Sequence, residues 1–282
     1  MPTRIDAHQH FWRYDPQRDS WITPEMRQLR RDFLPLDFSE QLRSNGMHSS
    51  IAVQADQSED ETRFLLGLAD KNPEISGVVG WVDLRSPKLR QRLQHFSGFR
   101  KLCGFRHIVQ SEPDDRFLLR DDFSKGVAQL SEFEFTYDIL IYPHQLPDAV
   151  KFAQRFPQQK LVLDHMGKPA IRSGEIHAWA SHIRKLAELP NVWCKVSGLV
   201  TEASHEGWKF RDFVPYLDVA FAAFGPQRLM FGSDWPVCLL AGDYASVQNI
   251  IEKYMQNFSE LDREAVFGLN AERFYKREMS HK

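Results

Sequence analysis

The chain has 282 residues, of which 42% are hydrophobic and 26% are charged, and its formal net charge is −2. This composition supports a packed core and excludes intrinsic disorder, and without a basic excess it argues against a nucleic-acid partner. Cys103, Cys194 and Cys238 are widely spaced, which does not suggest a disulfide framework or a Cys-rich zinc site. No run approaches the ~18 to 20 apolar residues that span a membrane, and no apolar secretory segment opens the sequence. We therefore expect a cytoplasmic protein without a membrane partner.

Short apolar, β-branched segments recur along the whole chain. We predict eight strands, near Arg4–Phe11, Ser49–Asp56, Ser76–Leu84, Leu102–Ile108, Phe135–Ile141, Lys160–Gly167, Asn191–Gly198 and Arg228–Pro236. Several of them are nearly continuous apolar runs, which are typical of parallel strands buried on both faces.

Segments with apolar residues at helical spacing separate these strands. The clearest are Glu61–Lys71, Ile176–Leu189, Trp208–Phe224 and Tyr244–Phe258, and a terminal helix over Asn270–Lys276 is expected to close the rim. Strand and helix that alternate eight times predict an α/β fold, the (β/α)8 or TIM barrel. Because no linker or repeat interrupts the pattern, we expect one domain over residues 1–282. No heptad seam or apolar surface stripe indicates an oligomeric state.

A long insertion, Trp12–Pro35, follows the first predicted strand and is rich in Trp, Arg and Pro. In a barrel it would lie over the active-site end, as a lid or a pocket wall. It could equally be a loop that only covers a hydrophobic edge.

Polar residues gather where the predicted strands end. They are His8 and His10, Arg106 and His107, Asp164 and His165, Ser197, and Asp234. Chemistry in a barrel takes place at the carboxyl ends of its strands. Packing alone does not explain so many polar ends, because an unpaired buried charge is costly.

His8 and His10 are two residues apart on a strand, so their side chains are expected to point the same way. Two adjacent imidazoles can bind a divalent metal or polarise a carbonyl, although hydrogen-bonded core histidines are the plainer interpretation of a lone pair. Asp6 is expected to share their face one step deeper, where it would fix an imidazole or pair with Lys195.

Asp234 follows the apolar run Leu229-Met-Phe-Gly-Ser, so it must be paired or act as a functional base. Gly232 lies on its face and is expected to leave room for a ligand. The alternative is an aspartate that caps the following loop. A closed barrel would bring Asp234 beside the two histidines, where a carboxylate can activate water.

The stretch Asp164-His-Met-Gly-Lys-Pro169 supplies further candidates. We expect His165 to share the inward face of Leu161 and Leu163, and Asp164 to point toward the helices. Lys168 would reach the rim and contact a substrate oxygen, or remain a solvated lysine.

Arg106 would hold a carboxylate or carbonyl through its fork of donors, or form a salt bridge inside the barrel. Trp81, Tyr137 and Trp235 could stack on a sugar-like ring, or pack in the core or rim. Motifs for dinucleotides, nucleotides and serine hydrolases are absent from the sequence.

The sequence resembles the amidohydrolase superfamily, in particular its branch of sugar-lactone and pyrone-dicarboxylate lactonases. The resemblance runs nearly end to end and is carried by Asp6-Ala-His-Gln-His-Phe-Trp12, Gly104-Phe-Arg-His107, Leu163-Asp-His-Met-Gly-Lys-Pro169, Lys195-Val-Ser-Gly198, Phe231-Gly-Ser-Asp-Trp-Pro236 and Asn270-Ala-Glu-Arg-Phe-Tyr275. The nearest group is similar to L-fucono-lactonases and L-rhamnono-lactonases.

The resemblance implies a distorted (β/α)8 barrel of the metallo-dependent-hydrolase type, with Asp234 as general base and His8, His10 and His165 around the reaction centre. These four residues would hold one divalent metal, Zn²⁺, or none. The bridging lysine of the two-metal members has no counterpart on a middle strand, because Lys195 comes too late and Lys168 lies past its strand.

We expect the protein to hydrolyse a sugar lactone to the free sugar acid, with Arg106, Lys168 and the rim aromatics holding the hydroxylated ring. The alternatives are a metal-dependent decarboxylase of the same superfamily and a barrel that binds a ligand without catalysis.

Overall fold

The computed structural model describes residues 3–277, and in this range a parallel sheet of eight strands runs in the order β1 to β8. The strands are β1 Ile5–Gln9, β2 Ser49–Val53, β3 Ile75–Gly80, β4 Leu102–Ile108, β5 Thr136–Leu140, β6 Leu161–Leu163, β7 Val192–Val196 and β8 Leu229–Phe231. The sheet closes into a barrel because Gln9 and Trp235 form a parallel bridge. His10 N–H donates to the Trp235 carbonyl (2.7 Å), and Asp234 N–H donates to the His8 carbonyl (2.8 Å).

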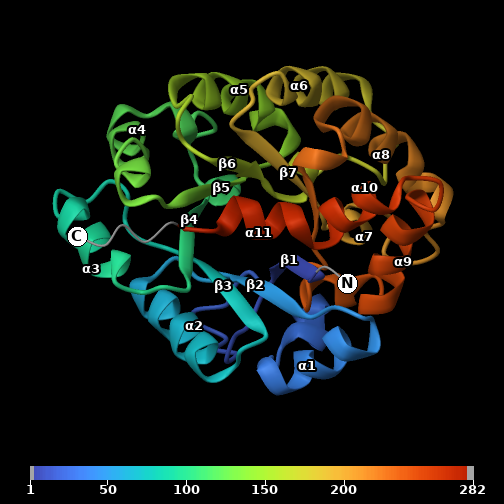
Figure 1. Ribbon diagram of the computed structural model, residues 1–282, viewed down its shortest axis with the longest axis horizontal. Coiled ribbons are helices and arrows are strands. Elements are labelled where there is room, and N and C mark those ends of the chain that lie inside the picture. The colour runs from blue at the N-terminus through green and yellow to red at the C-terminus, as the bar shows by residue number, and fades with distance from the viewer. Residues whose placement is uncertain (1–2, 278–282) are drawn as a thin grey trace.

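Helices surround the barrel, and α11 lies across its middle in the view of Figure 1. They are α1 Pro35–Ser44, α2 Glu59–Lys71, α3 Leu89–Ser97, α4 Asp121–Val127, α5 Leu146–Arg155, α6 His177–Ala187, α7 Leu199–Glu202, α8 Phe210–Phe224, α9 Tyr244–Tyr254, α10 Glu260–Glu264 and α11 Asn270–Tyr275. The predicted (β/α)8 architecture is confirmed. None of the helices between residues 3 and 277 is long and apolar enough to cross a membrane.

The terminal helix α11 seals one end of the barrel. Phe274 and Tyr275 of this helix pack into an inner apolar cluster with side chains of the strands, among them Ile5, Val162 and Met230. Val162 therefore faces the barrel interior, whereas its neighbours Leu161 and Leu163 belong to the outer core between strands and helices. The predicted site residues lie at the opposite end of the barrel, where the carboxyl ends of the strands meet.

A bulge interrupts the alternation of β1. Asp6 pairs with Ser50 and Gln9 with Ala52, so a step of three residues on β1 opposes a step of two on β2. One extra residue in a strand turns the following side chains to the other face. Asp6 consequently does not share the face of His8.

The insertion after β1 serves both of the roles that the sequence left open. Its residues Ile22, Leu29 and Phe33 are buried in the outer core together with Trp12. Trp21 is 40% exposed and lines the cavity at the carboxyl ends of the strands. The insertion thus packs against the outer core through these buried residues, and at Trp21 it forms part of the cavity wall.

Candidate active site

A cavity of about 240 Å³ lies at the carboxyl ends of the strands. Five of the predicted site residues line it: His10, Arg106, His165, Lys168 and Asp234. Side chains from the loops after β1, β4 and β8 complete the wall. The predicted candidates therefore come together around one space.

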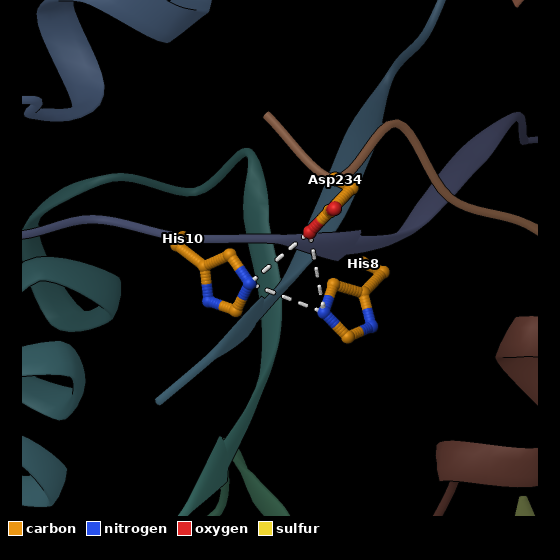
Figure 2. Close-up of side chains that lie close together, drawn as sticks. All are labelled: His8, His10 and Asp234. Carbon is orange, nitrogen blue, oxygen red and sulfur yellow. Dashed lines mark hydrogen bonds and ion pairs between the residues drawn. The ribbon is translucent and has the colours of Figure 1, made fainter. Parts of the chain in front are cut away.

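His8, His10 and Asp234 form the centre of this site (Figure 2). Asp234 Oδ1 lies 3.4 Å from His10 Nε2 and 3.8 Å from His8 Nε2, and the two Nε2 atoms are 3.2 Å apart. All three side chains are nearly inaccessible to solvent. The first and last strands of the barrel thus bring the paired imidazoles into contact with the C-terminal acid.

His165 reaches the same centre by a different route from the one predicted. The chain turns left-handed directly after β6, with φ near +53° at His165 and Met166, +68° at Gly167 and +54° at Lys168. This turn places His165 Nε2 3.9 Å from Asp234 Oδ1. The expectation that His165 continues the face of Leu161 and Leu163 is wrong, because those two side chains point outward and the turn reorients His165.

Two glycines make room for the imidazoles. A Cβ on Gly232 would lie 2.6 Å from the His8 Cβ, and one on Gly198 would lie 2.8 Å from the His165 ring. Gly198 also has a φ of +65°, which disfavours a side chain. The space at Gly232, predicted for a ligand, is taken up by His8.

Below the histidines, buried charges form a closed network. Lys195 Nζ lies 2.6 Å from Asp138 Oδ2, 3.0 Å from Asp164 Oδ1 and 3.1 Å from His8 Nδ1. Arg106 Nη1 donates to Asp164 Oδ2 at 3.0 Å. Asp164 therefore points into the barrel, and its predicted orientation toward the helices is wrong. Val162, two residues earlier, already faces inward, and strand alternation carries Asp164 to the same side.

Tyr275 connects this network to the helix that seals the barrel. Its hydroxyl donates to Asp138 Oδ2 at 2.8 Å. Asp6 remains outside the network. It accepts from the Ser233 amide (3.0 Å) and the Tyr244 hydroxyl (3.1 Å), and burial raises its pKa to about 6. The sequence expectation that Asp6 pairs with Lys195 is wrong, because the bulge in β1 directs Asp6 toward α9.

Burial sets the protonation of the imidazoles. It lowers the pKa of His165 to about 4 and, reinforced by the charge of Lys195, holds the pKa of His8 well below its ordinary value. Both rings are therefore neutral at pH 7. Burial alone would raise the pKa of Asp234, but the neighbouring His165, His10 and His8 hold it below its usual range. Asp234 is thus an ionised carboxylate beside the neutral rings of His8 and His165.

The residues at the centre fit a single divalent metal ion. His10 Nδ1 lies 2.8 Å from the Val53 carbonyl, which can only accept, so the lone pair of His10 Nε2 faces Asp234. Metal-bound histidines commonly have this arrangement. Ligands at ~2.0 to 2.1 Å around a tetrahedral zinc ion are about 3.4 Å apart. The separations of 3.2 to 3.8 Å among the His8, His10 and Asp234 donors are close to that value.

A second group of possible ligands, His8, Asp164 and His165, is different. The Lys195 ammonium already lies within hydrogen-bonding distance of His8 Nδ1 and Asp164 Oδ1. A positive charge at these atoms opposes a cation there. In the first group Arg106 Nη1 lies 3.3 Å from His8 Nε2, which leaves His10 and Asp234 as the better donors for one metal ion.

Arg106 and Lys168 lie where the sequence placed them. Arg106 is 3% exposed, lines the cavity and makes the buried salt bridge to Asp164, so both of its predicted roles are compatible with its position. Lys168 lies at the rim, with its Nζ 3.9 Å from Glu202 Oε1 and 5.5 Å from the centre of the Tyr142 ring.

The three aromatic candidates do not line this cavity. Tyr137 packs between Phe123 and Phe152 in the outer core, because its neighbour Asp138 is the residue of β5 that faces inward.

Trp235 packs against Phe38 of α1. Trp81 donates from Nε1 to His107 Nδ1 at 3.3 Å. The three side chains therefore pack around the site without lining the cavity, whereas Trp21 does line it.

Sequence reasoning missed Asp138, Tyr275 and Gln110. Asp138 is a single carboxylate within the apolar strand Thr136-Tyr-Asp-Ile-Leu140, and that pattern could have marked it as paired. Tyr275 and Gln110 carry no comparable signal, since their positions depend on how α11 and the loop after β4 fold.

The chain is similar to known proteins along almost its whole length. The family model described as Amidohydrolase matches residues 5–277. An L-fucono-1,5-lactonase of Burkholderia multivorans is 45% identical over 286 residues, covering 96% of this chain and 95% of that protein. A crystal structure of a Burkholderia multivorans amidohydrolase with bound zinc shares 46% identity and a TM-score of 0.94, covering 97% of this chain and 99% of that one.

A crystal structure of 2,6-dihydroxybenzoate decarboxylase from Rhizobium covers 98% of this chain and 99% of its own, with a TM-score of 0.69. At 14% identity, this likeness concerns the fold alone. The match of the family model to nearly all of the barrel, together with the 45% identical relative, shows that the chain belongs to the amidohydrolase family.

Proposed function

We propose that the protein is a lactonase that hydrolyses a sugar lactone, such as L-fuconolactone or L-rhamnonolactone, to the free sugar acid. The observation that carries the proposal is the convergence of the ionised Asp234 with three imidazoles at one cavity. A site that only binds a ligand has no need of a carboxylate placed to activate water. The 45% identical relative is named as an L-fucono-1,5-lactonase, which supports this substrate class.

Asp234 acts as the general base in the proposed reaction. It takes a proton from a water molecule, whose oxygen attacks the carbonyl carbon of the lactone. The tetrahedral intermediate then expels the ring oxygen as an alkoxide. Asp234 returns the proton to this alkoxide. The net reaction adds one water to the lactone, and the side chain of Asp234 is ionised again at the end.

His165 stabilises the negative charge that develops on the carbonyl oxygen. Its Nδ1 lies 2.9 Å from the Ser197 hydroxyl. If Ser197 donates to Nδ1, the neutral ring carries its proton on Nε2, which faces the cavity. A fixed N–H at this place donates to the oxyanion without reorganisation, and such donors are worth roughly 3 to 4 kcal/mol.

Arg106 and Lys168 bring positive charge to the wall of the cavity and hold the oxygens of the sugar ring. His8, His10 and Asp234 would hold a divalent ion, for which we propose zinc, and such an ion would supply Lewis-acid polarisation of the carbonyl. His165 would adjoin that ion through its contact with Asp234.

A panel of aldonolactones tests the proposal, because hydrolysis releases acid that a pH indicator reports. We expect turnover of at least one deoxysugar lactone well above the rate in buffer. A panel without turnover, in protein of verified fold and metal content, would refute the function.

Metal content is tested separately. Activity that falls on chelation and returns with zinc supports the zinc site, whereas full activity in protein shown by elemental analysis to be metal-free removes zinc from the proposal. The decarboxylase alternative predicts release of CO₂ from an aromatic acid, and no contact in the site favours it over the lactonase.

A further inference from the structure

The wall of the cavity contains one amide whose oxygen is not used by the protein. Gln110 lies in the short 3-10 helix Val109–Ser111, directly after β4, and lines the cavity. Its Oε1 is buried, and among residues 3–277 it has no hydrogen-bond partner. An unpaired buried carbonyl oxygen costs about 1 to 3 kcal/mol, so such groups usually have a partner in the working state of a protein.

The loop that carries Gln110 is held firmly in place. Gln57 Oε1 accepts from the Ile108 amide at 2.7 Å, and Ser111 Oγ donates to the Ile108 carbonyl at 2.9 Å. The Glu112 amide donates to the Val109 carbonyl at 3.0 Å. Hydrogen bonds therefore hold the backbone on both sides of Gln110, whose half-buried side chain lines the cavity.

The surroundings of Gln110 define what it can recognise. Ile108, Leu140 and Val237 give the cavity apolar walls, while Arg106 and Lys168 carry full positive charges. Gln110 differs from both kinds, because a neutral amide offers an acceptor and donors together. A hydroxyl group also both donates and accepts, so it pairs well with an amide. A carboxylate would instead pair with the cations Arg106 and Lys168.

We infer that Gln110 is a specificity-determining residue that hydrogen-bonds one hydroxyl of the lactone ring. The inference rests on the proposed lactonase function and adds the group by which the enzyme distinguishes hydroxylated lactones from plain ones. A site built to pair with a hydroxyl discriminates strongly against an analogue that lacks it, because its own polar group is then left unpaired.

Gln110→Met tests the assignment, since methionine keeps the length of the side chain and removes the amide. We expect kcat/KM for a hydroxylated aldonolactone to fall about 5- to 100-fold. For unsubstituted δ-valerolactone, kcat/KM should stay within twofold of the wild type. Gln94→Met, the same substitution on an exposed position of α3, is the matched control and should change neither value.

A series of monodeoxy lactones then identifies the hydroxyl. The effect of Gln110→Met should vanish for the one analogue that lacks the recognised hydroxyl and persist for the others, as in a double-mutant cycle. Thermal unfolding of each variant verifies that the fold is kept. If Gln110→Met has no native fold, Gln110→Ala takes its place in the same series.

The outcomes separate the two proposals. A wild-type enzyme that hydrolyses no lactone refutes the function itself. A wild type that is active, with a Gln110→Met variant equally active on every lactone, refutes only the inference. An equal loss on all lactones, δ-valerolactone included, also overturns it, because Gln110 would then act on the shape of the site and not on a hydroxyl.

Discussion

The two ends of the barrel follow opposite rules. At the end sealed by α11, apolar side chains such as Ile5, Met230 and Phe274 fill the interior, as in any packed core. At the carboxyl end, buried histidines and a carboxylate crowd together, and Asp234 adopts a left-handed φ of +57°. Left-handed backbone and buried charge both cost stability, and they concentrate at functional sites.

Between these two ends lies the network around Lys195, and it explains how they coexist. Lys195 and Arg106 form ion pairs with Asp138 and Asp164, so the strands can carry charge in the interior. The carboxylate of Asp234, one layer above, lies beside imidazoles at the cavity. Paired charges thus support the structure, whereas the carboxylate that we propose as general base lies among imidazoles.

The largest effect is expected for Asp234→Asn, which alters the carboxylate at the active end. We expect kcat/KM on an active lactone to fall about 10³- to 10⁴-fold, because asparagine cannot take the proton from water. The free energy of unfolding should fall as well, since the pKa of Asp234 lies below its usual range and the folded protein therefore favours the charged carboxylate. Steady-state kinetics and urea unfolding measure the two effects. Asp70→Asn, on an exposed face of α2, is the control for both, and near-normal activity of Asp234→Asn would contradict its role as base.

Lys195→Met should act mainly on stability. Asp138 and Asp164 would lose their shared cation while they remain buried, and breaking such a pair costs roughly 3 to 5 kcal/mol of unfolding free energy. Lys151→Met removes an exposed ion pair with Asp148 and should cost less than about 1 kcal/mol. Urea unfolding followed by circular dichroism compares the two variants. Equal losses in both would contradict a structural role for the buried network.

How far the sequence predicts the molecule differs between the same two ends. Every predicted strand overlaps an observed one, because apolar runs are a direct consequence of burial on both faces. At the site, β6 was predicted to reach Gly167 and β8 to reach Pro236, but they end at Leu163 and Phe231. The apolar pattern continues past the point where the backbone turns left-handed, and residue type alone does not set that angle.

Side-chain directions were predicted well only where the strand alternates regularly. The bulge in β1 separated Asp6 from His8, and the turn after β6 brought His165 to the inward side that Asp164 already faces. The convergence of Asp234 with the paired histidines was predicted, because it requires only that the barrel closes. The pairing of Lys195 with Asp138 was not, since it depends on the depth of each residue inside the barrel.

Glu61 shows the cost of buried charge at the rim of the active end. This residue of α2 is 5% exposed, and burial raises its pKa to about 7, with Asp56 and Asp19 adding to the shift and Arg18 opposing it. A raised carboxyl pKa gives stability that is present below the unfolded value near 4.5 and is lost as the pH rises to about 7. We expect Glu61→Gln to be stabilised relative to the wild type above pH 7, by on the order of 3 kcal/mol, and to match it near pH 4.5.

Thermal unfolding of Glu61→Gln and wild type between pH 4.5 and 8 measures this difference. Glu206→Gln, at an exposed position, serves as the matched control. A gap between Glu61→Gln and wild type that is the same at every pH would show that the Glu61 carboxyl ionises normally in the folded protein.

The smallest expected effect belongs to the end that carries no chemistry. Glu134 is exposed, has a φ of +59° and precedes β5 at the sealed side of the barrel. Glu134→Gly should raise the free energy of unfolding by about 0.5 to 1 kcal/mol, because relief of the left-handed strain exceeds the entropy that glycine adds to the unfolded chain. Activity should not change, and urea unfolding with lactone assays measures both.

Lys168→Gly relieves the same strain at the active end, but it also removes an amine from the cavity wall and should therefore reduce kcat/KM. If Glu134→Gly instead lowered activity, strain at the sealed end would be coupled to the site, and the division between the two ends would not hold.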